Sequence, residues 1–392
     1  MSGFKNRVDD MVDNMLASHL LFINCHYGYN KIELINAKRK EMEREERTLI
    51  IYHGEKDFKD LIEEYENDCM TLVDFIDYPN MEKSIIIADA YGELISMIDG
   101  EIMLSDIISE LGPNTFDSII IMNVNYMFMG LLDIISMHFI NAPVLCIGDS
   151  EAMVTDTAVL KALNNTRYFF NDVYRMRGYN AEILYFIKKL RTGVINRLER
   201  STTRDMMINK VQTEEDFYNS DEVMDYSVVI DTTGRFREYN IALRNSIGFD
   251  FMPNINEPMV NITPFIATSN NGKRVVVDAY NIFKVKSIST ENGILRATFE
   301  HREQEIEIPL NTHYLSKVTE SDIPLDIAPH EAGVKMEFAY FIPPRVAVNK
   351  AFPDVLIYFQ NRESIYARKL LISMLSSCVR SFKIKTDYEY YL

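Results

Sequence analysis

A short stretch near the start of the chain has the residue types of a phosphate-binding loop, with several of them replaced. Residues 25–32 read CHYGYNKI and lie between the apolar run LLFI and a charged stretch of helical composition. A loop that cradles phosphates needs a glycine at each end, then a lysine, then a serine or threonine for the metal. Here Lys31 is in place, but Cys25 and Asn30 occupy the glycine positions and an isoleucine follows the lysine. The pattern predicts a vestigial nucleotide site with Gly28 and Lys31 as candidate ligands.

The composition and charge limit the partners that the chain can have. The chain has 392 residues, of which 47% are apolar and 25% charged, and its formal net charge is −17. This length is sufficient for two or three folded domains. Nucleic-acid binders usually carry a basic surface that releases counterions from phosphates. The acidic balance therefore argues against a strong, unspecific DNA-binding surface, although Lys and Arg cluster locally at 38–40, 197–210 and 362–369.

The sequence indicates an intracellular protein without a membrane segment. No stretch has the roughly 20 uncharged apolar residues that a membrane span needs, and the first residues lack a signal-peptide cleavage pattern. We therefore expect a cytoplasmic location, which is the host cytoplasm if the source is a virus. The cysteines form no close pair and have no histidine at metal spacing, so free, buried thiols and no metal site are expected at positions 25, 69, 146 and 378.

The first half of the chain alternates apolar strands with amphipathic helices. The expected strands are LLFIN, TLIIYHG, FDSIIIMNVN and APVLCIGD, and helices are expected over 31–46, 56–67 and 127–138. Such alternation predicts a parallel sheet that is covered by helices on both faces. We assign residues 1–196 to this α/β domain and the polar, charged residues 197–225 to a linker.

The second half begins as another α/β unit and then changes its pattern. The run SVVI and the helical stretch REYNIALRNSIG open the unit, and MEFAYFI, DVLIYF and ARKLLISML complete it. Between them, residues 253–310 show period-two alternation with the turns NNG and ENG, which predicts a small inserted antiparallel β-barrel. The second α/β domain then comprises residues 226–252 and 311–392. The aromatic tail KIKTDYEYYL either docks on this domain or binds a partner.

Taken in order, these elements resemble a superfamily 1 helicase of the RecD/Dda type. HYGYNKI is similar to the phosphate loop, FDSIIIMNVNYM to the metal-binding strand, and APVLCIGDSEAM to the sensor that contains GD-x-x-Q. NDVYRMRG resembles the segment with the first phosphate-contacting arginine, which makes Arg175 a candidate nucleotide ligand. The resemblance implies two RecA-like parallel-sheet domains, a small β-barrel inserted in the second, and a site for ATP in the cleft between the domains.

The chemistry of that family requires groups that this chain lacks. The metal-binding strand should end in two acidic residues, but residues 122–125 read MNVN. The sensor glutamine falls on Ala152 and the C-terminal arginine falls on Ser377, with Arg380 nearly a helical turn beyond. An arginine finger alone is worth about 10³–10⁵ in rate, because phosphoryl transfer depends on positioning and charge. The resemblance therefore implies a helicase-like pseudoenzyme, which needs no ATP or Mg²⁺ cofactor.

The candidate ligands also have structural interpretations. Lys31 lies at the first turn of a helix, where a lysine is often only solvated. His26 and the tyrosine after it would crowd a phosphate that glycines normally admit, which favours a loop closed by its own side chains. Arg175 can form a structural salt bridge with Asp172 or Asp149 in place of a phosphate contact.

These observations lead to three hypotheses about function. The first is a catalytically inactive helicase-like protein that is a binding or architectural subunit of a replication or transcription assembly, with protein subunits as partners and only weak binding of single-stranded DNA. The second is a diverged but active DNA helicase that uses ATP and Mg²⁺. The third is a protein-interaction module without DNA binding. The resemblance to Dda, a phage replication helicase, and the abundance of Ile, Asn, Met and Tyr suggest a bacteriophage with an AT-rich genome.

Overall fold

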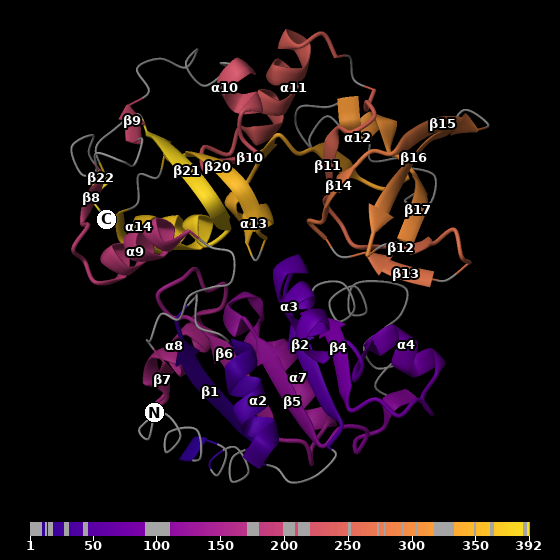
Figure 1. Ribbon diagram of the computed structural model, residues 1–392, viewed down its shortest axis with the longest axis vertical. Coiled ribbons are helices and arrows are strands. Elements are labelled where there is room, and N and C mark those ends of the chain that lie inside the picture. Colours follow the sequence, from indigo (N-terminus) through magenta and orange to yellow (C-terminus); the bar gives the residue numbers. More distant parts are fainter. Residues whose placement is uncertain are drawn as a thin grey trace. The chain divides into compact units, whose positions relative to one another are not determined.

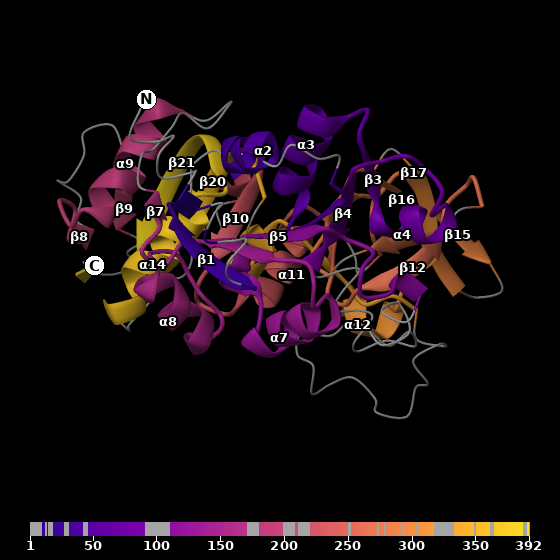
Figure 2. The ribbon, with the colours of Figure 1, turned by 90° about the horizontal axis from the view of Figure 1, so that it is seen from below.

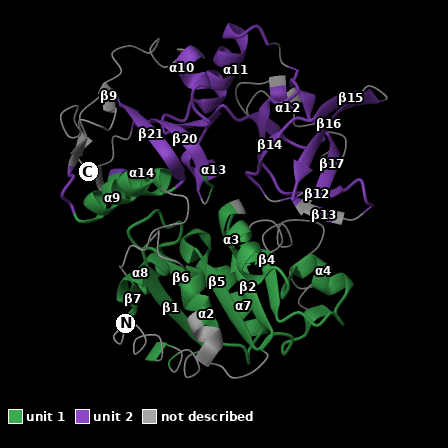
Figure 3. Cartoon of the chain, in the orientation of Figure 1, with its two compact units in different colours: residues 1–192, 349–351, 368–376 green, residues 193–348, 352–367, 377–392 purple. Residues whose placement is uncertain are grey.

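The chain divides into two units, each with its own parallel sheet (Figure 3). The computed structural model describes residues 10–11, 14, 19–26, 31–41, 46–90, 110–170, 180–198, 208–210, 220–249, 252–272, 274–277, 279–291, 294–302, 304–316, 333–348, 350–360, 364–386 and 390–391. Unit 1 contains residues 1–192 together with 349–351 and 368–376, and unit 2 contains the remainder. A segment close to the C-terminus is therefore part of the unit that the first half of the chain builds.

The sheet of unit 1 has seven parallel strands in the order β3-β4-β2-β5-β6-β1-β7 (Figure 1). These strands are β1 (Leu20–Cys25), β2 (Thr48–Tyr52), β3 (Cys69–Thr71), β4 (Ile85–Asp89), β5 (Ser118–Met122), β6 (Val144–Gly148) and β7 (Phe169–Phe170). Every residue of β2, β4, β5 and β6 is buried. Continuous apolar runs of this kind are typical of strands that are covered on both faces, so the predicted parallel sheet is confirmed.

Helices cover both faces of this sheet. Figure 2 shows α2 (Lys31–Glu41) and α3 (Glu55–Tyr65) on one side, with α7 (Met129–His138) and α8 (Thr157–Asn165) on the other. The first pair packs Leu34, Ile35 and Leu61 into one core layer. The second pair and the short α4 (Leu72–Asp77) pack into a separate layer with Phe75, Leu132 and Leu163. The two layers hold the strands rigidly, so the side chains just beyond the strand ends have fixed positions.

Unit 2 contains a five-stranded parallel sheet in the order β19-β10-β20-β21-β9. The strands are β9 (Ile208–Lys210), β10 (Val228–Asp231), β19 (Phe341–Ile342), β20 (Phe352–Tyr358) and β21 (Cys378–Thr386), and the helices are α10 (Ser220–Met224), α11 (Phe236–Ser246) and α13 (Pro344–Ala347). The helix α14 (Ser364–Leu375) begins in unit 2 and belongs to unit 1 from residue 368 onward. β9 lies within the polar stretch that we assigned to a linker, and it joins the sheet edge through backbone pairing with β21. Backbone pairing at an edge needs few apolar side chains, which explains why the hydrophobic pattern gave no sign of it.

The segment between α11 and β19 forms three small antiparallel sheets around one apolar core. These are β14-β11-β18, β12-β13 and β15-β16-β17, from β11 (Pro258–Asn261), β12 (Phe265–Thr268), β13 (Arg274–Val277), β14 (Ile282–Lys284), β15 (Ser287–Glu291), β16 (Ile294–His301), β17 (Gln304–Pro309) and β18 (Met336–Phe338). The predicted antiparallel pairing is present, and its closure into a barrel stays a prediction. Because β18 pairs with β11, the paired region continues past residue 310, beyond the short α12 (Thr312–Ser316).

The structure also describes the cysteines and the aromatic tail. The four cysteines are free and buried, as predicted. The aromatic tail contributes β22 (Tyr390–Tyr391), which pairs antiparallel with β8 (Arg197–Leu198). The tail thus pairs with this chain's own residues 197–198, which lie in the segment assigned to the linker and not in the predicted second domain. Among the described residues, no helix is long and apolar enough to cross a membrane.

Candidate functional site

The candidate site lies beyond the carboxyl ends of four neighbouring strands of unit 1. In open α/β sheets, ligands bind at this edge. The charged and amide side chains that follow β1, β2, β5 and β6 are Lys31, Asp57, Asn123, Asn125 and Asp149. They form two hydrogen-bonded groups, one around Lys31 and one around Asp149.

Lys31, the lysine of the degenerate phosphate loop, is held by two side chains of its own unit. Its ammonium group lies 3.6 Å from the Asp57 carboxylate, and the two side chains are only 12% and 5% exposed. The ammonium also donates a hydrogen bond to the side-chain oxygen of Asn123, whose amide nitrogen donates to Asp57. The charge of Lys31 is therefore compensated from within the chain. A phosphate could bind here only by competing with the Asp57 carboxylate.

Asn123 takes part in this group because the backbone turns sharply at the end of β5. The residue has φ 54° and ψ 48°, in the left-handed region, which asparagine adopts more readily than most residues. A short 3-10 turn follows at Val124–Tyr126 and brings Asn125 toward β6. The two asparagines stand at the positions for which the sequence resemblance predicts acidic residues.

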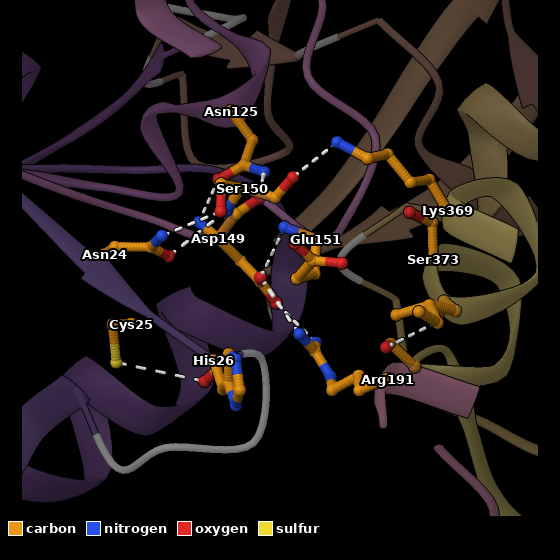
Figure 4. Close-up of polar contacts among 12 residues, drawn as sticks. Asn24, Cys25, His26, Asn125, Asp149, Ser150, Glu151, Arg191, Lys369 and Ser373 are labelled. Atoms are coloured by element: carbon orange, nitrogen blue, oxygen red, sulfur yellow. Dashed lines mark hydrogen bonds and ion pairs between the residues drawn. The ribbon is translucent and has the colours of Figure 1, made fainter. Parts of the chain in front are cut away.

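The amide of Asn125 binds the backbone at the end of β6 (Figure 4). Its nitrogen donates to the carbonyl oxygens of Asp149 at 2.6 Å and Met153 at 3.2 Å. Its oxygen accepts a hydrogen bond of 2.7 Å from the Asp149 N–H. A carboxylate at this position would place a negative oxygen against two carbonyl oxygens. The contacts therefore favour an amide over a carboxylate, and both polar atoms of this amide are engaged within unit 1.

Asp149 forms a buried ion pair with Arg191, the last residue of α9 (Ala181–Arg191). Arg191 Nη1 donates to Asp149 Oδ1 at 3.0 Å, and Nη2 contacts the second carboxylate oxygen. The two side chains are 4% and 5% exposed, and the Glu151 N–H also donates to Oδ1 at 3.0 Å. This carboxylate orders the loop after β6 and is engaged by donors on both oxygens.

The same loop is fixed by β1 and α14. Asn24 and Ser150 exchange two hydrogen bonds, of 2.7 Å between their side chains and 3.2 Å from the Ser150 N–H. From α14, Lys369 Nζ donates to the Ser150 carbonyl at 2.6 Å, and the Ser373 hydroxyl accepts from the Met153 N–H at 3.0 Å (Figure 4). The loop where helicases carry their sensor glutamine is thus held by main-chain and side-chain contacts, with Ala152 buried within it.

His53 follows β2 and lies near both charged groups of the Lys31 cluster. Its ring is 4.9 Å from the Tyr126 ring. Burial lowers the pKa of His53 to about 4, although the nearby carboxylates of Asp89 and Asp57 act in the opposite direction. The imidazole is therefore neutral at pH 7 and adds no charge to the site.

The other predicted site residues have separate outcomes. Gly28 and Arg175 lie outside the described residues. His26 packs edge-on against Phe169 with 4.9 Å between ring centroids, and burial lowers the pKa of this histidine. Arg380, three residues beyond the aligned arginine position, lies on β21, because α14 ends at Leu375.

Arg380 is engaged at the surface of unit 2. Its guanidinium forms an ion pair with Asp354, to which Arg380 Nε donates a hydrogen bond of 2.9 Å. The side chain is 72% exposed, and the Asp354 carboxylate raises the pKa of Arg380. At the aligned arginine position, Ser377 is buried.

Three residues that organise the site were absent from the sequence prediction. Asp57, Arg191 and Lys369 come from α3, α9 and α14, far along the chain from their partners. Asp57 and Arg191 lie in ordinary helix-terminal turns, where charged residues are common for reasons of local stability. Within the described residues, no group of three or more His, Cys, Asp or Glu side chains could hold a metal ion.

Comparisons with known proteins identify the fold. No protein-family model matches the sequence, and no curated protein matches it. A solved structure of Pif1 helicases unwinding forked double-stranded DNA is 10% identical, with coverage of 97% of this chain and 91% of that one and a TM-score of 0.51. Pif1 helicase from Candida albicans (11% identity, 97% and 93% coverage, TM-score 0.45) and Pif1 from Bacteroides with ADP-AlF3 and single-stranded DNA (13%, 93% and 93%, 0.43) also match. The first likeness shows the fold alone: the two units with their parallel sheets are arranged along the chain as in that Pif1 helicase structure.

Proposed function

We propose that the chain is a catalytically inactive helicase-like protein of the RecD/Dda type that acts as a binding or architectural subunit of a nucleic-acid-processing complex. Its setting is a bacteriophage replication or transcription assembly. The observation that carries the proposal is the group formed by Lys31, Asp57 and Asn123, in which the phosphate-loop lysine is neutralised by a carboxylate of its own unit.

The geometry of the neighbouring side chains supports the loss of hydrolysis. Phosphoryl transfer requires a metal ion, a group that orients the attacking water and cations on the phosphates. At the metal position, Asn123 and Asn125 are amides whose hydrogen bonds go to other parts of unit 1. The nearest carboxylates, Asp57 and Asp149, are paired with Lys31 and Arg191. Losses within one site are not additive, but together they bring the expected rate close to background.

A direct test is ATP hydrolysis by the full-length protein, with and without single-stranded DNA. We expect no turnover above background and no difference between the wild type and Lys31→Ala. Turnover that DNA stimulates and that Lys31→Ala abolishes would establish the second hypothesis, an active ATP-dependent DNA helicase.

A thermal-shift assay with inorganic pyrophosphate tests whether the Asp57 carboxylate competes with phosphate for Lys31. Only a state that binds ligand is stabilised by mass action, so the wild type should show no shift. Asp57→Asn removes the carboxylate that compensates Lys31, and we expect this variant to be stabilised by pyrophosphate. The double variant with Lys31→Ala is the matched control, because it lacks the cation. A shift of equal size in the wild type and in Asp57→Asn would contradict the internal competition.

Nucleic-acid binding separates the first hypothesis from the third, a pure protein-interaction module. The net charge of −17 opposes encounter with phosphates, so we expect weak binding of single-stranded DNA that is lost near physiological salt and recovered with a basic partner. The logarithm of affinity should fall by about 0.7 per neutralised phosphate per unit of log salt. Fluorescence anisotropy of a labelled oligonucleotide measures this slope. Tight, salt-resistant binding by the chain alone contradicts partner dependence, and absence of binding at low salt favours the third hypothesis.

A further inference from the structure

A hollow of about 500 Å³ lies at the amino edge of the seven-stranded sheet, opposite to the edge that carries Lys31. It is lined by residues of the segments that lead into β4, β2 and β5, three neighbouring strands. The lining includes Arg47, Phe75, Ile76, Pro79, Leu111 and Asn114. We call this feature the amino-edge hollow. Its size is within the range of sites that bind small molecules or receive side chains of a partner.

Phe75, which lines the amino-edge hollow, stands at the end of a row of packed aromatic rings. Phe75 is buried, its ring lies 6.0 Å from that of Phe116, and Phe116 lies 5.4 Å from Phe139. The guanidinium of Arg47 stands 5.0 Å from the centre of the Phe75 ring. Two hydrogen bonds of 2.9 Å join Arg47 and Asp117. The Arg47 backbone N–H donates to the Asp117 carboxylate, and the Asp117 backbone N–H donates to the Arg47 carbonyl oxygen. The Phe75 ring and the cation beside it are therefore held in place before any partner arrives.

Exposed apolar side chains stand on the two segments that flank the hollow. Tyr78 and Met81, next to the lining residue Pro79, are 58% and 51% exposed. Met137 and Ile140, at the end of α7, are 78% and 65% exposed. The residue after Ile140 donates a hydrogen bond of 2.6 Å to Asn114 in the hollow, which places this end of α7 beside it. Exposed apolar groups beside a hollow are typical of interaction sites, and methionine and aromatic residues are enriched at protein interfaces.

We propose that the amino-edge hollow is a docking site for a protein partner that places an apolar side chain against Phe75 and a carboxylate on Arg47. Charge complementarity selects this partner: among the described residues, no carboxylate forms an ion pair with the Arg47 guanidinium, although Glu110 also lines the hollow and the Asp117 carboxylate accepts a hydrogen bond from the Arg47 backbone N–H. A single cation beside Glu110, with an apolar rim, is poorly suited to a phosphate backbone, which requires several cations. The proposal assigns a partner-binding surface to the architectural subunit described under the proposed function. That the partner is a protein rests on this proposed function.

The test uses a displayed library of random short peptides, selected on the full-length protein, with affinities measured by fluorescence anisotropy. We expect the selected peptides to combine an apolar residue with Asp or Glu. Arg47→Gln should weaken their binding by about tenfold or more, because it removes one partner of a desolvated charge pair. Met137→Asp, at a highly exposed position, should weaken it as well without affecting folding. Tyr185→Ser, which alters an exposed aromatic residue on α9, is the matched control and should leave the affinity unchanged.

The possible outcomes separate this proposal from its alternatives. Failure to select any peptide, or peptides that bind equally well to Arg47→Gln and Met137→Asp, would overturn it. Sedimentation of the wild type as a dimer that Met137→Asp dissociates would identify a second copy of this chain as the occupant, and would also overturn it. ATP hydrolysis measured on the same preparations reports on Lys31 at the opposite edge. An active ATPase with intact peptide binding would contradict only the proposed function. Absence of ATP hydrolysis together with failed peptide binding would contradict only the docking site.

Discussion

The two edges of the unit 1 sheet differ in how their charged groups are used. At the carboxyl edge, Lys31 and Arg191 are each compensated by a buried carboxylate of the same unit. At the amino edge, Arg47 stands over the Phe75 ring and its guanidinium has no ion pair among the described residues. The edge at which this fold binds ligands is thus filled by the chain itself, while the other edge presents a hollow with an apolar rim.

This difference separates side chains that stabilise the fold from side chains that are available to a partner. A buried ion pair in which one member is removed leaves an uncompensated charge, so the carboxyl edge should be sensitive to substitution. An exposed residue with few contacts should tolerate change. If the comparison is correct, variants at the carboxyl edge will lose stability, and variants at the amino edge will lose only binding.

The largest effect is expected from Arg191→Met. It leaves the Asp149 carboxylate buried without its cation, and we expect the free energy of unfolding to fall by about 3–5 kcal/mol. Chemical denaturation measures this loss of stability. The control is Lys188→Met, at an exposed position of the same helix, which should lower the free energy of unfolding by less than about 0.5 kcal/mol. Adding Asp149→Asn to Arg191→Met should recover part of the stability. A loss below about 1 kcal/mol would mean that the ion pair does not order the site.

Asn125→Asp should come next, with a loss of about 1–3 kcal/mol at pH 7. The new carboxylate faces the carbonyl oxygens of Asp149 and Met153, which now accept hydrogen bonds from the amide. A protonated acid can still donate one of these bonds. The folded state should therefore raise the pKa of the new acid, and the deficit should grow as pH rises above about 4.

Denaturation at several pH values measures this dependence, with the exposed Asn164→Asp as the matched control. Stabilisation of Asn125→Asp by Mg²⁺ would show that the position still accepts a metal ion. That result would contradict the distinction between a carboxyl edge that is filled by the chain's own side chains and an amino edge that presents a hollow.

An effect of similar size, confined to acidic pH, is expected from the titration of His53. Its pKa is about 4 in the folded state and 6.5 in the reference state, so the unfolded chain binds the proton first as pH falls. Stability from the neutral imidazole is complete above pH 6.5 and is lost as pH falls toward about 4. We expect a contribution of about 1–3 kcal/mol across this range, and His53→Gln should flatten the profile. Identical pH profiles of the two proteins would contradict the burial of the ring.

The smallest effect on stability is expected from Arg47→Gln. The described side-chain interaction of Arg47 is with the Phe75 ring, and such a contact is worth about 0.5–1 kcal/mol at exposed sites. Thermal and chemical unfolding should therefore be almost unchanged, although peptide binding is weakened. A stability loss as large as that of Arg191→Met would show that Arg47 has a structural role and would erase the contrast between the edges.

The sequence predicted the sheet of unit 1 because its central strands are continuous apolar runs, which only burial on both faces explains. The absence of acidic residues at 122–125 can also be read from the sequence alone. The partners of Lys31 and Asp149 were beyond its reach, since Asp57 and Arg191 approach them only after the chain has folded. Periodicity locates a helix, but it does not tell which of several charged residues at the helix end turns inward.

The same limit applies to the asparagines of the site. The absence of carboxylates at Asn123 and Asn125 was visible in the sequence, and it predicted a loss of chemistry. The amide contacts show in addition what these residues do: they bind Asp57 and the backbone of Asp149. This second role depends on the left-handed turn at Asn123, which the hydrophobic pattern does not indicate.

The contribution of residues 368–376 to unit 1 has a consequence for synthesis on the ribosome. Lys369 and Ser373 bind the loop after β6, yet they are translated only after most of unit 2 has emerged. A nascent chain that ends after α9 therefore lacks part of the first unit and exposes the surface that α14 will cover. We expect a fragment of residues 1–192 to be poorly stable when expressed alone, and a separately supplied α14 peptide to rescue it in trans.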